Sequence, residues 1–243
     1  MTGEPLLAVE SLCAWYGGAQ ILFDVALSVG RGEVVALMGR NGAGKSTTMK
    51  TIMGLVGRRR GTVRFADRDI SRLEPYRIAR LGLGFTPEDR RIFADLTVLE
   101  NLDIGRQPPR RFADGMPAPA WTPERLFALF PNLAERQHNL GGEMSGGEQQ
   151  MLTVGRTLMG NPLAVLLDEP SEGVAPIIVE QMADTILKLK EQGLAILLSE
   201  QNIQFAELVC DRAYVLEKGH IRWQGAMAEL LRNDDVQRTF LTM

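Results

Sequence analysis

The sequence has 243 residues, of which 45% are hydrophobic and 23% are charged. These proportions are typical of a soluble globular protein and exclude a disordered chain or a coiled coil. A net charge of −3 argues against a protein that coats nucleic acid. The apolar runs are far shorter than the roughly 20 residues that span a bilayer, and the N-terminus has no readable export signal. The distant Cys13 and Cys210 suit a reducing cytosol better than a disulfide framework.

The early part of the chain favours antiparallel strands. Residues 6–9, 21–29 and 62–65 are short β-type runs separated by turns that contain glycine. Further along the chain, apolar strands alternate with helices, which predicts a mainly parallel sheet with helices on its faces. We therefore expect an α/β fold with an antiparallel β edge. The other expected strands are residues 34–38, 164–167, 195–198 and 214–216, and the expected helices are residues 45–55, 147–159, 177–190 and 203–209.

Two segments are predicted to lie at the surface. Residues 107–123 contain five of the twelve prolines, too many for a helix interior, which indicates an exposed inserted loop. The run Arg58-Arg59-Arg60 falls in an expected turn between a helix and a strand. Such a cluster is typical of a solvated surface, so we expect no nucleic-acid partner.

Residues 39–46 have the pattern of a phosphate-binding loop. They stand between a predicted strand and a predicted helix, as that assignment requires. Glycines let successive backbone N–H groups curl around a polyphosphate, Lys45 supplies a cation for the β- and γ-phosphates, and the Ser46 hydroxyl is a ligand for Mg²⁺. The residues expected to hold a nucleotide here are Gly39, Asn41, Gly42, Ala43, Gly44, Lys45, Ser46 and Thr47.

A second predicted strand ends in two carboxylates, Asp168 and Glu169. Ligands gather at the carboxyl ends of parallel strands, so these side chains should meet the phosphates. We expect Asp168 to hold Mg²⁺ through water and Glu169 to orient the attacking water. Standing alone, two acidic residues before Pro170 would more often only open a turn.

A third motif opens the helix predicted from residue 147. Ser145 followed by Glu148 predicts a capping box. A capping box does not explain Gly146 and Gly147, because glycine in a helix costs about 0.5–1 kcal/mol relative to alanine. We interpret this helix start, Ser145 to Glu148, as a second terminus that faces phosphate.

Together the three motifs resemble the Walker A, signature and Walker B motifs of the ATP-binding subunits of ABC transporters. The resemblance implies a P-loop NTPase fold in a single domain. Residues 1–85 and 161–243 would form the nucleotide-binding core with its β edge, and residues 86–160 would hold a Q-loop-like segment, the Pro-rich insertion and a helical subdomain. It also implies that Tyr16 stacks on adenine, a role for which the neighbouring Trp15 competes.

Finer features resemble one branch of that family, the ATPases of branched-chain amino-acid uptake and of the similar urea or amide importers. They lie in residues 86–93, 96–102, 171–176 and 200–202. Three residues depart from the general pattern. Glu88 replaces the Q-loop glutamine and becomes an expected Mg²⁺ ligand, Ala175 replaces the D-loop aspartate, and Gln201 replaces the switch histidine. The resemblance assigns catalysis to Glu169, Gln201 and Lys45, whereas His138 and His220 match no catalytic position.

The resemblance further implies an enzyme that hydrolyses ATP with Mg²⁺ as a peripheral subunit on the cytoplasmic face of the membrane. Two ATPase chains, identical or paralogous, would pair head to tail, so that Lys45 of one and Ser145 of the other hold the same ATP. Separate transmembrane permeases, docked near residues 88–102 and the helices before Ser145, and a periplasmic binding protein would complete an importer. The sequence does not identify the solute that this importer would transport. A soluble ABC-type ATPase of DNA repair, translation or cofactor assembly is the alternative, while intact Lys45, Asp168 and Glu169 disfavour a non-hydrolysing sensor.

Overall fold

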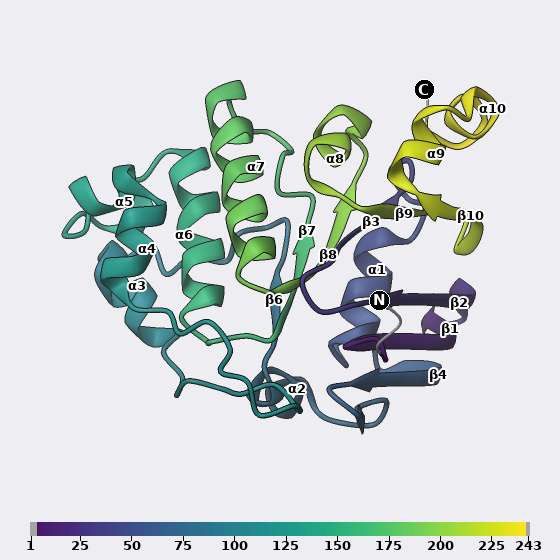
Figure 1. Cartoon of the computed structure of the whole chain (residues 1–243), viewed down its shortest axis with the longest axis horizontal. Coiled ribbons are helices and arrows are strands. Elements are labelled where there is room, and N and C mark those ends of the chain that lie inside the picture. Colours follow the sequence, from purple (N-terminus) through teal and green to yellow (C-terminus); the bar gives the residue numbers. More distant parts are fainter. Residues whose placement is uncertain (1–3, 242–243) are drawn as a thin grey trace.

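The computed structural model describes residues 4–241, whose strands form two sheets (Figure 1). The first is antiparallel, in the order β2-β1-β4-β5, and the second has the order β10-β9-β3-β8-β7-β6. The second sheet is parallel except for β10, which runs antiparallel to β9. The predicted α/β fold with an antiparallel edge is confirmed. The strands are β1 (Leu7–Tyr16), β2 (Ala19–Val29), β3 (Val34–Met38), β4 (Arg58–Phe65), β5 (Arg68–Asp69), β6 (Leu83–Thr86), β7 (Ala164–Asp168), β8 (Ala195–Glu200), β9 (Arg212–Glu217) and β10 (His220–Ala226).

The central strands are apolar throughout because both faces of the parallel sheet are covered. Side chains alternate between the faces along each strand. Val34 and Ala36 pack in one hydrophobic cluster with the helices on one side, whereas Val35 and Leu37 pack in the other with the antiparallel sheet. Every residue of β3, β7 and β8 is buried, so these strands form a rigid base for the loops that follow them.

The four helices predicted from periodicity are present, with ends displaced by three residues or fewer. They are α1 (Lys45–Ile52), α6 (Gly146–Leu158), α7 (Pro176–Glu191) and α8 (Ile203–Val209). The remaining helices have three to seven residues and were not predicted, since one or two turns give only a weak periodic signal. They are α2 (Pro75–Leu81), α3 (Val98–Ile104), α4 (Pro123–Leu129), α5 (Pro131–Glu135), α9 (Met227–Leu231) and α10 (Asp234–Val236). Among residues 4–241, no helix is long and apolar enough to cross a membrane.

Both predicted surface segments differ in part from expectation. The arginine run does not lie in a turn, because it begins β4: Arg58 stacks 4.9 Å from the ring of Trp15, and Arg59 donates to the carbonyls of Val56 (2.8 Å) and Ser71 (3.1 Å). Residues 107–122 have no helix or strand, as predicted. However, this insertion is anchored, since the side chain of Trp121 is buried in the core.

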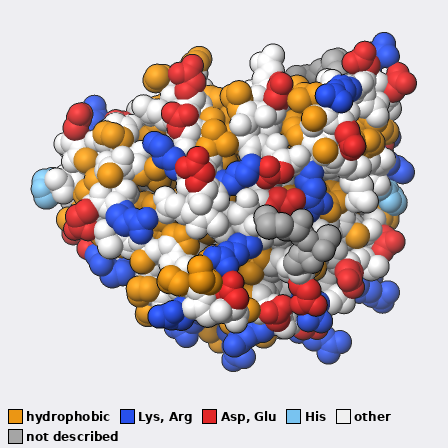
Figure 2. Space-filling view, viewed as in Figure 1, with side chains coloured by type: hydrophobic (Ala, Val, Ile, Leu, Met, Phe, Trp, Pro, Cys, Tyr) orange, Lys and Arg blue, Asp and Glu red, His pale blue; other side chains and the backbone are white. Residues whose placement is uncertain are grey.

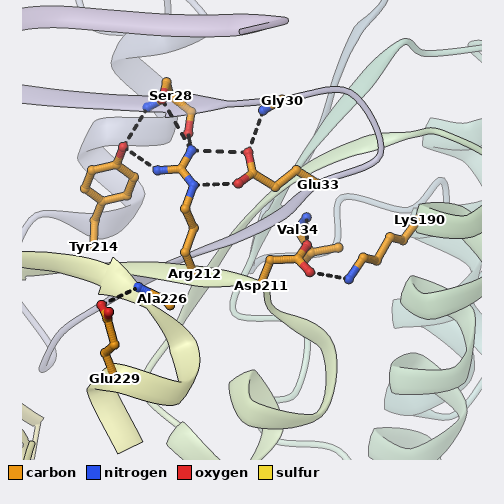
Figure 3. Close-up of polar contacts among 10 residues, drawn as sticks. All are labelled: Ser28, Gly30, Glu33, Val34, Lys190, Asp211, Arg212, Tyr214, Ala226 and Glu229. Atoms are coloured by element: carbon orange, nitrogen blue, oxygen red, sulfur yellow. Dashed lines mark hydrogen bonds and ion pairs between the residues drawn. The ribbon is translucent and has the colours of Figure 1, made fainter. Parts of the chain in front are cut away.

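A polar network joins the amino ends of β3 and β9 (Figure 3). Arg212 contacts both carboxylate oxygens of Glu33, at 2.5 and 3.2 Å, and donates to the Tyr214 hydroxyl at 2.8 Å. Beside it, Asp211 accepts from the Val34 N–H at 3.0 Å. This edge of the sheet is therefore held by groups that are paired with one another.

Candidate nucleotide-binding site

The loop between β3 and α1 has the backbone that its glycines predict. Gly42 (φ 77°) and Gly44 (φ 110°) lie in the left-handed region, which disfavours residues with a side chain. At Gly39, a Cβ atom would lie 2.4 Å from the carbonyl oxygen of Leu216. Helix α1 starts directly afterwards at Lys45, so the unsatisfied N–H groups of its first turn open at this loop.

A cavity of about 350 Å³ opens over this loop. Tyr16 stands at its wall with half of its side chain exposed, whereas Trp15 contacts Arg58 and Arg60 instead. Of the two aromatic residues, Tyr16 is thus the one available to a base. The lining is Tyr16, Ile21, Asn41, Gly42, Gly44, Lys45, Ser46, Thr47, Glu88 and Glu169, of which only Ile21 was not expected from the sequence.

The three residues assigned to catalysis are in direct contact. The Lys45 ammonium lies 2.9 Å from Glu169 Oε1 and also donates to the carbonyls of Gly39 (2.8 Å) and Arg40 (3.2 Å). Gln201 Nε2 donates to Glu169 Oε2 at 2.7 Å. Both side chains of the ion pair are almost fully buried. Each oxygen of Glu169 therefore has a donor, and the Lys45 ammonium is held between the loop carbonyls and Glu169.

Asp168 keeps one carboxylate oxygen without a partner. Its Oδ1 accepts from Ser46 Oγ (3.0 Å) and Ser199 Oγ (2.6 Å), whereas its buried Oδ2 has no hydrogen-bond partner within residues 4–241. Burial raises the pKa of Asp168, an effect that the two hydroxyls partly oppose. A buried carboxylate oxygen beside a serine hydroxyl fits Mg²⁺, which binds one or two carboxylates together with substrate phosphates. Glu88 lines the same cavity but is exposed.

Two further polar residues near the site, Ser199 and Glu200, were not assigned a role from the sequence. Ser199 donates to Asp168, and the buried Glu200 accepts the N–H groups of Ser171, Gln201 and Asn202. Burial raises the pKa of Glu200. Both residues end β8, beside β7, and a polar Ser-Glu pair closing an apolar strand was a signal that could have revealed them.

Glu172 and Glu169 form a carboxyl pair. The hydrogen bond with Glu169, together with partial desolvation of this exposed residue, raises the pKa of Glu172 to about 7. Burial alone would raise the pKa of Glu169, but hydrogen bonds from Glu172 and Lys45 outweigh it and hold this pKa below its ordinary value. Glu169 also has a positive φ of 48°, a strained conformation for a residue with a side chain and one often found at functional sites.

The residues from Ser145 to Glu148 do not line this cavity. Their capping box is present: Glu148 N–H donates to Ser145 Oγ at 3.4 Å, and Ser145 N–H donates to Glu148 Oε2 at 2.8 Å. The glycines have a reason within the chain, because a Cβ on Gly147 would lie 2.7 Å from Ile178 of α7. A Cβ on Gly146 would lie 2.8 Å from the Arg90 guanidinium.

Comparison with known proteins decides the family. Residues 22–172 match the family model described as ABC transporter. The chain belongs to the ABC transporter family. The branched-chain amino acid transport ATP-binding protein BraG of Pseudomonas aeruginosa is 41% identical, over 97% of this chain and 99% of its own length. The lipopolysaccharide export ATP-binding protein LptB of Escherichia coli is 35% identical over 97% and 96%. A solved ATP-binding cassette of an ABC transporter is 30% identical with a TM-score of 0.79, over 97% of both chains.

As an ABC ATPase the chain binds and hydrolyses ATP, as the sequence motifs predicted. Subunits of this kind are peripheral to the membrane, pair with a second ATPase and work with transmembrane permease subunits. In the described part of the chain the histidines stay outside the cavity, since His138 is exposed and His220 stacks on Phe23 with ring centroids 4.7 Å apart.

Proposed function

We propose that this chain is the ATP-hydrolysing subunit of an importer of branched-chain amino acids. It would act at the cytoplasmic face of the cell membrane, with separate permeases and a periplasmic binding protein that delivers the solute. The 41% identity to a branched-chain amino acid transport ATPase supports this assignment over lipopolysaccharide export, at 35%. Glu88, Ala175 and Gln201 are the residues by which the sequence departs from the general family pattern toward this branch. Import of urea or short amides is the alternative within the same branch.

The observation that carries the catalytic part of the proposal is the contact of Lys45 and Gln201 with the two oxygens of Glu169. ATP would bind over the loop, with its adenine against Tyr16 and its phosphates at Lys45. A polyphosphate carries more negative charge than one carboxylate, so Lys45 would exchange Glu169 for the phosphates. That exchange leaves Glu169 ionised, because its pKa is held low, and able to accept a proton from the attacking water.

The remaining polar residues position these groups. Ser46 and Asp168 would hold Mg²⁺, which supplies charge neutralisation at the phosphates when it is bound. Ser46 and Ser199 both donate to one oxygen of Asp168, which leaves the other oxygen, without a partner in the described residues, for the metal. The Gln201 amide orients Glu169 in the resting site and can donate to a phosphate oxygen during turnover. Glu88 would reach the metal from the cavity wall.

The site is incomplete within one chain. Ser145, Gly146, Gly147 and Glu148 lie outside the cavity of their own chain, which supports a head-to-tail pair in which the second copy supplies this motif. In this arrangement residues 86–160 form the subdomain that carries the motif, and residues 1–85 with 161–243 form the nucleotide-binding core. Whether the pair is a homodimer or joins a paralogous ATPase is an outcome of the test below.

An uptake assay tests the proposal. Cells that lack this gene are complemented with the wild-type chain or with Glu169→Gln, and uptake of labelled leucine, isoleucine and valine is measured beside uptake of urea and a short amide. We expect the wild type alone to restore uptake of the three amino acids. Restored uptake of urea or the amide without amino-acid uptake would move the assignment to the urea or amide importers of the same branch. The tagged chain should also co-purify with permeases and with its ATPase partner, whereas ribosomes or DNA-repair factors in their place would refute a transport role.

A further inference from the structure

A second hollow, of about 420 Å³, lies away from the nucleotide-binding site. Besides Leu163, which precedes β7, three separate segments build it: the β4–β5 hairpin, the end of α2, and the Pro-rich insertion. Each contributes arginine to the lining, which contains Arg68, Arg80, Arg110 and Arg111 and no acidic residue. The volume falls within the roughly 300–1,000 Å³ typical of small-ligand sites.

In the part of the chain that the structure describes, these four arginines have no carboxylate partners. Within residues 4–241, none of them forms an ion pair, and Asp114 of the insertion pairs with Arg31 instead. The chain as a whole is acidic, with a net charge of −3, so this concentration of unpaired positive charge is local. Figure 2 shows Lys and Arg side chains along the lower margin of the molecule, where Figure 1 places α2.

Arg110 fixes the walls of the hollow. Its guanidinium donates to the carbonyl of Asn161 at 3.0 Å and to the carbonyl of Arg80 at 2.6 Å, which ties the insertion to the end of α2. The approach is close: a Cβ on Gly82 (φ 103°) would lie 2.9 Å from Arg110 Cδ. Arg110 is half-buried, and its burial lowers its pKa. The site is therefore formed before any ligand arrives.

The other three arginines retain most of their donors. Arg111 donates to the Gly115 carbonyl at 2.9 Å, and the guanidinium carbon of Arg80 lies 5.6 Å from the centroid of the Tyr76 ring. A guanidinium has five N–H donors in a planar fork that matches phosphate oxygens in pairs. Several guanidinium groups around one hollow favour a multiply charged anion. Phe65 and Leu163 add apolar surface to the lining.

We propose that this hollow binds a phosphate-bearing anion, either a small soluble phosphate compound or the headgroup of an acidic phospholipid. The anion would bridge α2 and the Pro-rich insertion, and this role is independent of the transported solute. Anion binding would give a function to the Pro-rich insertion, which takes no part in the proposed ATP hydrolysis.

Calorimetry with pyrophosphate tests the soluble source. The full chain is first saturated with a non-hydrolysable ATP analogue and Mg²⁺, so that the phosphate-binding loop is occupied. Co-sedimentation with phosphatidylcholine vesicles, with and without phosphatidylglycerol, tests the lipid source. The variant Arg68→Gln/Arg80→Gln/Arg111→Gln removes three exposed lining charges and leaves the bridging Arg110 intact. We expect this variant to bind either pyrophosphate or the phosphatidylglycerol vesicles at least about tenfold more weakly than the wild type. The assay in which binding weakens identifies the source of the anion.

The matched control is Arg64→Gln/Arg72→Gln/Arg77→Gln. It removes three exposed arginines from the same region of the chain, none of which lines the hollow. It should change the affinity by less than about threefold, because exposed charges outside a site are screened. An equal loss in both triple variants, or no binding of the wild type in either arm, would overturn the proposal.

Discussion

The amino and carboxyl ends of the strands in the six-stranded sheet differ in whether their polar groups have partners. At the amino ends of β3 and β9, Arg212 and Glu33 satisfy each other, and Asp211 is shared between Lys190 (2.5 Å) and the Val34 N–H (Figure 3). At the carboxyl ends, one oxygen of Asp168 has no partner in the described chain, and Glu169 is strained.

The difference shows which end is prepared for a ligand. Charges that have partners stabilise the fold or are neutral to it, whereas an unpartnered buried oxygen costs about 1–3 kcal/mol and is retained where a ligand compensates for it. Substitutions of Lys45, Glu169 and Gln201 at the carboxyl end should therefore change turnover, and substitutions at the amino end should change stability. The following predictions test that division, from the largest expected effect to the smallest.

Glu169→Gln should lower ATP hydrolysis by about 10²- to 10⁴-fold, because the amide keeps the shape of the side chain but cannot accept the proton of the water. ATP binding should persist, and ATP should then drive a stable dimer that sedimentation velocity detects. Hydrolysis at the wild-type rate would show that Glu169 is not the catalytic carboxylate.

Lys45→Ala should lower hydrolysis by about 10²- to 10³-fold and ATP affinity by at least about tenfold, since the phosphates lose their principal side-chain cation. Calorimetric titration measures the affinity. Because the change also leaves Glu169 buried without its cation, thermal unfolding serves as the control that the variant is folded. Unchanged affinity in the folded variant would count against the phosphate-binding loop.

Gln201→Ala should lower kcat by about 10- to 100-fold, the effect of losing one or two hydrogen bonds to charged groups, while ATP binding is retained. Glutamine does not titrate, so wild-type kcat should show no histidine-like inflection between about pH 6 and 8, whereas Gln201→His should introduce one. Full activity of Gln201→Ala would remove Gln201 from the catalytic set.

Arg212→Ala should leave kcat unchanged but lower the free energy of unfolding by about 1–3 kcal/mol, because it breaks charge-assisted hydrogen bonds to the half-buried Glu33. Urea denaturation provides the measurement. Arg222→Ala is the matched control, since the pair of Arg222 and Glu217 is longer, at 3.5 Å, and should contribute less than about 1 kcal/mol. A loss of turnover in folded Arg212→Ala would contradict the division between the two ends.

Glu172→Gln should produce the smallest effect, a change in how stability depends on pH. Glu172 has a pKa of about 7 in the folded chain against an ordinary value of 4.5, so the folded state binds more protons between these values. By linkage, its contribution to stability is complete below about pH 4.5 and is lost as the pH rises toward about 7. Solvent screens this exposed side chain, so the effect is modest. Urea midpoints at about pH 5 and about pH 8 should differ less in the variant than in the wild type.

Local patterns were enough to predict the parts of the molecule that depend on neighbours in sequence. The glycines and Lys45 of the loop, the apolar strand ending at Asp168, and the capping box of Ser145 and Glu148 all act within a few residues of one another. Their backbone conformation and burial follow from residue type and spacing, so each was found without coordinates.

Only the tertiary structure decided what those motifs meet. The contact of Lys45 with Glu169, the two hydroxyls on Asp168 and the placement of Gly147 against Ile178 join segments far apart in the chain. The short helices and the arginine-lined hollow likewise depend on packing between distant elements. The physical reason is that periodicity reports which face of one element is apolar, whereas the partner of that face is chosen by how all the elements pack together.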